Sequence, residues 1–516
     1  MFARAHTFTI EGLHTRHVIV EVDVRAGLPG FTIVGLADTA VREARERIQA
    51  AIRNCGYEFP ARRITANLAP GDVRKTGASL DLALACAVLA ASGQVPSELL
   101  ERVVLFGELA LDGAVRGSRG ALAVAQGTRH AGMSKLMLAG ACAREAQLID
   151  GVEVTVVECL ESAVRVLGGG AGDPLPAPAN AGERAPRDAA MRSGVRSRVD
   201  LGEVRNQQHA VRALVIAAAG AHNLLLSGPP GTGKTMLAQR LPTILPALSR
   251  AEAVEVTRIH SLSGTRVAAL ARERPFRAPH HSITTAGLIG GANSARAGEV
   301  VLAHNGVLFL DELSEFARAT LEALRQPLEE GRVAIVRAGH SAVYPARFML
   351  VAATNPCPCG YAGDGERCDC SEAEMARHRR RLSGPLLDRI DVLVNLRRVT
   401  DDEARMGAST SSARAREQVT TARERQANRL RAEGISANAH MDARMLKRHA
   451  RLDARGQEML RVARSRGLLS ARGEHRVMRV ARTIADLDAS ERIRTRDLGM
   501  ALALRPDVAI AGNRAA

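Results

Sequence analysis

The sequence predicts an α/β protein of three parts: an N-terminal α/β domain, an α/β core around a glycine-rich loop, and a C-terminal helical domain. Short apolar runs alternate with helical patterns through residues 1–398, which is typical of α/β folds. The loop after Leu226 stands between such a run and a helix, and the residues after 399 are charged and helical in period. We expect domains at 1–168, 200–398 and 399–516, joined at 169–199 by a linker.

The N-terminal domain is expected to be a self-contained α/β unit. Period-two or continuous apolar runs predict its strands, and Asp38 is expected to cap a helix that ends near Asn54. Ser79 is expected to start a second, very apolar helix. The remaining elements are strands at 17–24, 31–36, 63–70, 103–109, 135–140 and 152–158, with helices at 119–130 and 160–167. The linker 169–199 is rich in Gly, Ala, Pro and Arg and has no periodicity.

The core contains the most informative stretch, a loop between the apolar strand Leu224–Leu226 and the helix after it. It reads G-x-x-x-x-G-K-[ST] in the strand–loop–helix context that the motif requires. Backbone N–H groups of such a loop turn toward phosphate oxygens, the helix N-terminus adds positive potential, and Lys234 adds a full charge. We therefore predict that a nucleoside triphosphate binds Gly228, Pro229, Pro230, Gly231, Thr232, Gly233, Lys234 and Thr235.

Two further apolar runs of the core are expected to bring acidic and amide groups to that loop. The run Gly306–Leu313 contains Asp311 and Glu312 at the end of a strand. One carboxylate can hold Mg²⁺ together with the Thr235 hydroxyl, and the next can polarise the attacking water. The strand over 348–356 ends at Asn355, which is expected to sense the γ-phosphate or orient that water.

Four cysteines form a C-x-C-x8-C-x-C pattern directly after Asn355, within a segment expected to be an insertion at 357–370. Four thiolates at close spacing suit a tetrahedral, structural Zn²⁺ that holds a polar loop in shape. An iron–sulfur cluster or free thiols are the alternatives. The expected zinc ligands are Cys357, Cys359, Cys368 and Cys370.

Charge favours a polyanionic partner for the second and third parts of the chain. The formal net charge is +16, yet residues 1–170 contain 18 basic and 18 acidic side chains, whereas residues 401–516 contain 24 and 15. Aromatic residues make up 2 % of the chain, which argues against base stacking and for arginine contacts with phosphates, without sequence preference. A basic surface that is simply solvated is the alternative, and the run Arg377–Gly384 has the same two interpretations.

Targeting signals are not expected. The first ten residues lack the apolar segment of a signal peptide, and no run of about 18 apolar residues occurs. Cys55, Cys86, Cys142 and Cys159 are scattered, which fits a reducing compartment. The sequence predicts a soluble, cytoplasmic protein with no membrane partner.

Part of the N-terminal domain resembles the proteolytic domain of Lon, a fold shared with ribosomal protein S5. The resemblance lies in KTGASLDLALACAVL and GELALDGAVRG, and Ser79 stands where Lon has its nucleophile. The segment GSRGALAVAQGTRHAG, where Lon has its activating lysine, contains no lysine. Since a serine without a base is a weak nucleophile, we expect a scaffold or interaction domain that is not proteolytic.

The three strand motifs, with helices behind them, resemble the AAA+ ATPases. The stretch from Phe276 to Leu313, together with NPCPCG, LSGPLLDRIDV and LSARGEHRVMRVARTIADL, closely resembles magnesium-chelatase-like proteins of the ComM (YifB) family. The likeness covers nearly the whole chain, including a C-terminal helical lid. It implies a hexameric, ATP- and Mg²⁺-dependent DNA helicase that promotes branch migration on single-stranded or branched DNA during natural transformation, in company with recombination proteins.

The resemblance also implies roles for single residues. Arg389 matches the arginine finger that reaches the γ-phosphate of a neighbouring subunit, which requires an oligomer. Arg472 matches the sensor-2 arginine of the lid, with Arg476 as a close competitor. The catalytic set is thus Lys234, Asp311, Glu312, Asn355, Arg389 and Arg472.

Two segments are expected to project into the pore of a ring, or else to be structural inserts at a subunit interface. They are Pro279–Arg296 and Gly331–Phe348, the second patterned as a β-hairpin whose tip residues Arg337 and His340 are the candidates for contact with a DNA strand. Two other functions stay open: a magnesium-chelatase-like remodeller acting on a protein partner, and an ATP-dependent protease. The missing lysine argues against the protease.

Overall fold

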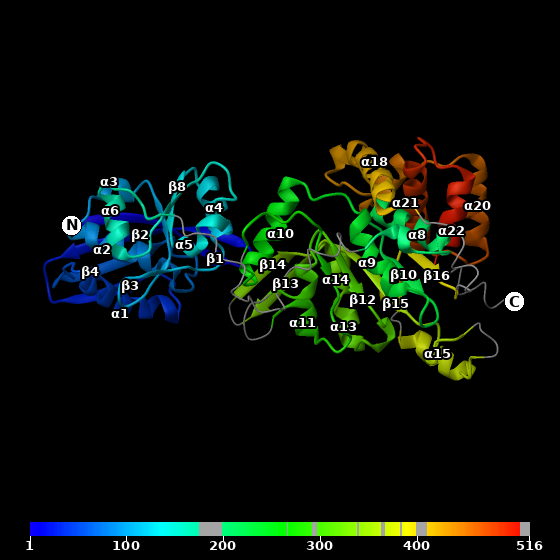
Figure 1. Cartoon of the computed structure of the whole chain (residues 1–516), viewed down its shortest axis with the longest axis horizontal. Helices are drawn as coiled ribbons and strands as arrows, with labels where there is room; N and C mark the ends of the chain where they lie inside the picture. Colours follow the sequence, from blue (N-terminus) through cyan, green and yellow to red (C-terminus); the bar gives the residue numbers. More distant parts are fainter. Residues whose placement is uncertain are drawn as a thin grey trace. The chain divides into compact units, whose positions relative to one another are not determined.

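The computed structural model describes residues 1–174, 199–265, 267–291, 297–337, 340–362, 367–381, 384–398 and 410–505 (Figure 1). It divides into two compact units, residues 1–189 with 253–271, and residues 190–252 with 272–516. Most of the expected linker, residues 175–198, lies outside the described residues. The domain limits expected from the sequence therefore stay predictions, and each unit is treated by itself.

The N-terminal unit is built on a seven-stranded mixed sheet of order β3-β4-β2-β1-β5-β8-β9. Strands β1, β2 and β4 pair antiparallel, and the other neighbours pair parallel. The strands are β1 (Phe2–Glu11), β2 (His14–Arg25), β3 (Gly30–Val34), β4 (Arg63–Ala69), β5 (Val104–Phe106), β8 (Lys135–Leu138) and β9 (Glu153–Val156), with a separate pair β6 (Glu108–Leu109) and β7 (Val115–Arg116).

The helices of this unit follow the sequence closely. The Asp38 carboxylate accepts from Val41 N at 2.9 Å, which confirms the predicted cap of α1. The apolar helix α2 is buried along nearly its whole length and packs on β1 and β2. The helices are α1 (Thr39–Asn54), α2 (Asp81–Ala91), α3 (Ser97–Leu100), α4 (Ala121–His130), α5 (Gly140–Ala146) and α6 (Leu160–Leu167).

The sequence did not predict the short helices α3 and α5. Two further features of this unit were not predicted either. Strand β1 is one of them. It buries small residues such as Ala3 and Ala5, so its buried positions are little more hydrophobic than its exposed ones. Residues 253–271, from most of α10 (Arg250–Leu262) onward, group with this unit although they lie far along the chain, and Ser261 Oγ donates to Glu145 at 2.5 Å. Both features depend on contacts between distant segments.

The second unit contains a five-stranded, fully parallel sheet of order β11-β12-β15-β10-β16. Its strands are β11 (Phe276–Arg277), β12 (Val307–Leu310), β15 (Met349–Thr354), β10 (Leu224–Ser227) and β16 (Val392–Asn395). Because parallel strands end at the same edge, the segments after β10, β12 and β15 lie together there. This confirms that the three motif strands share one sheet.

Short helices and one hairpin complete the core of this unit (Figure 1). The predicted β-hairpin is confirmed as β13 (Arg332–Arg337) paired antiparallel with β14 (His340–Pro345), while its tip residues Ala338 and Gly339 lie outside the described residues. The helices are α8 (Gln208–Gly220), α9 (Lys234–Ile244), α11 (Thr285–Ile289), α12 (Glu299–Leu302), α13 (Arg318–Ala323), α14 (Arg325–Glu330), α15 (Glu372–Arg381) and α16 (Gly384–Leu387).

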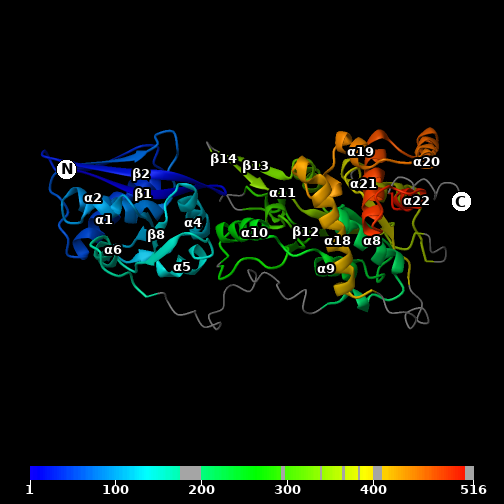
Figure 2. The same ribbon diagram turned by 90° about the horizontal axis from the view of Figure 1, so that it is seen from above.

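The C-terminal part is helical, as predicted. Helices α18 and α21 pack against α8 (Figure 2), and one hydrophobic cluster continues from the sheet into these helices. Helix α18 begins after its cap Ser411, and a non-helical stretch at residues 434–437 separates the 3-10 turns that follow it. The helices are α18 (Ser412–Leu430), α19 (Ala443–His449), α20 (Ala454–Ser465), α21 (Ala471–Leu487) and α22 (Thr495–Ala503). Among the described residues, no helix has the length and apolarity needed to span a membrane.

Candidate nucleotide-binding site

The glycine-rich loop links the end of β10 to the start of α9. Gly231 and Gly233 have φ of 79° and 85°, a left-handed conformation that glycine adopts without the strain other residues incur. At Gly228 an added Cβ would lie 2.7 Å from the Leu396 carbonyl oxygen, so only glycine fits there. The loop therefore has the turned backbone that a phosphate-binding loop needs.

The Lys234 ammonium group lies inside this loop, surrounded by oxygen atoms. Its Nζ donates to Gly228 O at 2.6 Å, to Pro229 O at 2.9 Å and to Asn355 Oδ1 at 3.1 Å. Burial lowers the pKa of Lys234, while the charges of Asp311 and Glu312 act in the opposite direction. The three acceptors are the kind of oxygen partner that phosphate groups would supply.

Thr235 and the two carboxylates meet at the same sheet edge. Thr235 Oγ1 donates to Asp311 Oδ2 at 2.7 Å, so a hydroxyl and a carboxylate oxygen lie together as ligands suited to Mg²⁺. Glu312 has φ 51° and ψ 51°, a left-handed conformation that is unusual for glutamate and strained. Its side chain is 59 % exposed, and Oε2 lies 3.5 Å from His281 Nδ1.

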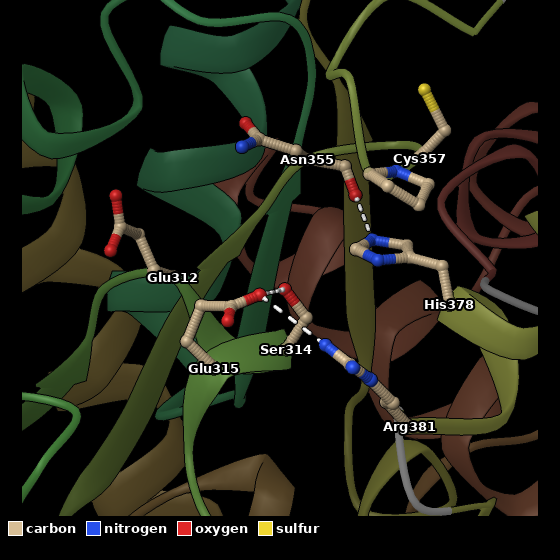
Figure 3. Close-up of a pocket in the computed structure, with 8 residues that line it drawn as sticks. Glu312, Ser314, Glu315, Asn355, Cys357, His378 and Arg381 are labelled. Atoms are coloured by element: carbon tan, nitrogen blue, oxygen red, sulfur yellow. Dashed lines mark hydrogen bonds and ion pairs between the residues drawn. The ribbon is translucent and has the colours of Figure 1, made fainter. Parts of the chain in front are cut away.

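Asn355 is held from both sides. Its side chain contacts Lys234, and its backbone carbonyl accepts from His378 Nε2 of α15 at 2.9 Å, which makes Nε2 the protonated nitrogen (Figure 3). A pocket of about 240 Å³ opens beside this contact. Its lining comes from three segments: Glu312, Ser314, Glu315, Asn355, Cys357, Pro358, His378 and Arg381.

The two arginines assigned by resemblance lie on segments outside the three strand motifs, in the turn after α16 and on α21. Arg389 follows α16 and pairs with Glu329, and its backbone carbonyl accepts from Asn223 Nδ2 at 2.8 Å. Arg472 is exposed in the first turn of α21. Arg476 is buried instead, and the negative charge of Asp391 acts on it. Of the two competitors on the lid, Arg472 is the one whose side chain is exposed.

The four cysteines of residues 357–370 come together. Their sulfur atoms all lie within 4.8 Å of one another, with Cys357–Cys359 at 3.3 Å, Cys357–Cys368 at 3.8 Å and Cys359–Cys368 at 3.7 Å. A tetrahedral ion with Zn–S bonds of about 2.3 Å requires sulfur atoms about 3.8 Å apart. The donor set therefore fits a metal ion such as zinc.

The two candidate pore segments are described in part. Pro279–Arg296 is described to residue 291; its His280 and His281 rings lie 4.0 Å apart, and His281 also faces Phe316. For the hairpin, the side chains of Arg337 and His340 lie outside the described residues. Their contact with DNA stays a prediction.

Sequence reasoning missed three residues around the site: His281 as a neighbour of Glu312, His378 as a support of Asn355, and Asn223 as a link to Arg389. His378 was read only as part of a basic run. It is, however, the one histidine within that run of arginines, and this is the signal that could have singled it out. Asn223 offers no such signal, since its side chain bonds backbone groups far along the chain, the carbonyl of Arg389 and the N–H of Leu350.

Comparisons with known proteins cover nearly the whole chain. Residues 200–404 match the family model of magnesium chelatase, subunit ChlI, residues 409–505 match its C-terminal model, and residues 20–141 match a third model, subunit ChlI of Mg-chelatase. An uncharacterized protein of Mycobacterium tuberculosis is 43 % identical over 94 % of both chains. The uncharacterized protein YifB of Escherichia coli is 42 % identical over 97 % of this chain and 96 % of its own. Competence protein ComM of Haemophilus influenzae is 40 % identical over 96 % and 95 %.

Proposed function

The chain belongs to the magnesium-chelatase-like AAA+ family that includes YifB and ComM, and we propose that it is an ATP-hydrolysing motor that translocates on DNA. Its parallel sheet is the AAA+ core, and its C-terminal helices form the lid. The observation that carries the proposal is the convergence of Lys234, Thr235, Asp311 and Asn355 at one sheet edge.

The site residues divide the work of ATP hydrolysis among them. Bound Mg²⁺ would neutralise charge on the phosphates, and Thr235 and Asp311 are the residues that would hold it. Lys234 binds phosphate oxygens, and the loop backbone from Gly228 to Gly233 orients them. Glu312 polarises the attacking water, and Asn355 orients it.

Completion of the site requires a second subunit. Within the chain, the Arg389 guanidinium pairs with Glu329. An arginine finger supplied by a neighbour would stabilise the charge that develops on the γ-phosphate, and Arg472 of the lid would contact the same nucleotide. This supports a homo-oligomer, and for this family a hexameric ring.

DNA is the proposed track of the motor. The excess of basic over acidic residues lies in the second and third parts of the chain, and arginine contacts with phosphates would not depend on sequence. Together with the relation to a competence protein, this supports branch migration on single-stranded or branched DNA during integration of transforming DNA. Recombination proteins are the expected partners, in the cytoplasm.

We assign structural zinc to Cys357, Cys359, Cys368 and Cys370, on the distances between their sulfur atoms. All four ligands come from the protein, so no coordination position is open for catalysis. The zinc would hold residues 357–370 in shape, because such a segment has few apolar side chains of its own.

Two other functions are weaker. A remodeller of a protein partner, like the magnesium chelatase subunit, would share the ATP site but leave the positive charge without a role. A Lon-like protease would need a base at Ser79, and none of the described hydrogen bonds joins the Ser79 hydroxyl to a lysine or histidine.

ATP hydrolysis with and without DNA tests the proposal. We expect forked or single-stranded DNA to raise the turnover of the full chain several-fold, equally for different sequences, with a steep loss of the effect as salt is raised. A duplex of the same length, without a fork or a single-stranded region, is the control for stimulation by the charge of DNA alone. If no DNA changes the rate while ATP is hydrolysed, the protein is an ATPase with another partner.

A further inference from the structure

The loop that carries the four cysteines packs directly on the nucleotide-binding loop. Gly360 has φ 89°, and an added Cβ there would lie 2.7 Å from Pro230 Cδ and 2.9 Å from Pro230 Cγ. The same position is 3.8 Å from Asn355 Cγ. The backbone between the two C-x-C pairs is therefore in close contact with both the P-loop and Asn355, and a side chain would separate them.

The cysteine loop is also tied to Asn355 at its two ends. Cys357 follows Asn355 by two residues, is fully buried, and lines the pocket that also contains Glu312 (Figure 3). On the other side, α15 begins two residues after Cys370 and carries His378, which is 5 % exposed and donates to the Asn355 carbonyl. Displacement of the loop would therefore move Asn355, either through the chain between Asn355 and Cys357 or through the hydrogen bond from His378.

The position of this loop depends on its sulfur atoms. Cys359, Cys368 and Cys370 are partly exposed, so burial of apolar surface does little to fix the segment. A metal ion that binds all four thiolates would cross-link the two C-x-C pairs and fix Gly360, which lies between them, against Pro230. The ion would thus influence the geometry of the ATP site without contacting that site.

We propose that the metal bound by the four cysteines positions Asn355 and the P-loop for ATP hydrolysis, and that His378 is the positioning residue that completes this link. The inference rests on the proposed hydrolysis of ATP at Lys234. It assigns the cysteine site a role in turnover, beyond holding its own segment in shape.

The test uses the full chain without DNA and measures bound zinc, the Kd for a fluorescent ATP analogue, and kcat. Cys359→Ser is expected to lose zinc, to lower kcat about 10- to 100-fold, and to change the Kd much less, because Lys234 and the loop amides remain. His378→Leu is expected to keep one zinc per chain and still lower kcat about tenfold. His378→Gln retains an amide donor for the Asn355 carbonyl and should restore most of the rate.

A pair of glycines gives a matched control for backbone strain. Gly360 and Gly434 have φ of 89° and 70°, but an added Cβ at Gly434 would meet nothing within 4 Å. Gly360→Ala should therefore lower kcat with zinc retained, whereas Gly434→Ala, with similar strain in the lid, should leave kcat unchanged.

Two outcomes would overturn the inference. One is a Cys359→Ser protein that lacks zinc and hydrolyses ATP at the wild-type kcat. The other is a wild-type protein that contains no bound metal even when it is prepared without strong chelators. Absence of ATP hydrolysis by the zinc-loaded wild type would instead contradict the proposed function, so the two failures are distinguishable.

Discussion

Lys75 of the N-terminal unit and Lys234 of the AAA+ core are both lysines whose pKa is lowered by burial, but their surroundings differ. Lys75 is fully buried, and its ammonium donates to the carbonyl of Pro70, with Asp72 as the nearby charge. Lys234 is half-buried, contacts three oxygen atoms, and faces Asp311 and Glu312. The first lysine stabilises a local turn, and the second belongs to a site open to a ligand.

The difference extends to the motifs around each lysine. Ser79 follows Lys75 by four residues in a stretch that resembles a protease, yet its described contact is a backbone one: its carbonyl accepts from Gly107 N at 3.0 Å. In the core, side chains from the segments that follow three strands meet. A motif read from sequence thus indicates chemistry only where the fold brings its partners to it.

Replacement of the two lysines should give the largest contrast. Lys234→Ala is expected to abolish measurable ATP turnover, because a charge aimed at the phosphates is lost. Lys75→Met should leave turnover unchanged and lower only the thermal stability of the N-terminal unit. Steady-state phosphate release and thermal unfolding of both variants check this. Hydrolysis that survives Lys234→Ala would contradict the assigned phosphate loop.

Mixed oligomers test whether the core site is shared between subunits. Arg389→Ala alone is expected to lower kcat about 1,000-fold, since a trans-acting arginine stabilises the transition-state charge. Mixing Arg389→Ala with Lys234→Ala subunits should recover part of the activity, because some interfaces then combine an intact loop with an intact finger. Arg318→Ala, an exposed arginine paired with Glu322 within its own helix, is the control. Failure of mixtures to exceed the sum of the two variants would argue for a site within one chain.

A buried acid at the junction of core and lid should have a smaller effect, on stability. Asp391 is buried; burial raises its pKa, but His222, Arg479 and Arg476 outweigh this and lower it. Because the folded pKa lies below the unfolded value, ionised Asp391 contributes stability at neutral pH that is lost as the pH falls through the folded pKa. Asp391→Asn should reduce the opening free energy of α21 by about 3 kcal/mol at pH 7. Amide hydrogen exchange at pH 7 and at a pH well below 3.8, the ordinary pKa of an aspartate, measures it, and the variant should lose less than the wild type on acidification.

The smallest effect is expected at Ser79. Ser79→Ala should change neither ATP turnover nor the rate at which an unfolded protein substrate is cleaved, which we expect to be zero for both proteins. The reason is the absence of an activating base among the described contacts of Ser79. ATP-dependent cleavage by the wild type that disappears in the variant would show that the N-terminal unit is a peptidase.

The elements that form the candidate nucleotide site were predictable from sequence, because each of them is local. The left-handed glycines Gly231 and Gly233, and the strand ends at Asp311 and Asn355, follow from neighbouring residues. The support of the site was not predictable. The contacts of His378 with Asn355 and of Gly360 with Pro230 join residues whose spacing in sequence, 23 for the first pair, carries no periodic signal.

The sequence by itself determined that the chain has a glycine-rich loop between a strand and a helix, an acidic strand end, a four-cysteine segment and a helical lid, since strand, loop and capping preferences act over a few residues. Only the tertiary structure decided that Arg476 is buried near Asp391 while Arg472 is exposed, that Lys75 is buried against Pro70, and that residues 253–271 group with the N-terminal unit. These outcomes depend on which distant segments share a buried surface, and the free energy of that burial is a property of the packed fold.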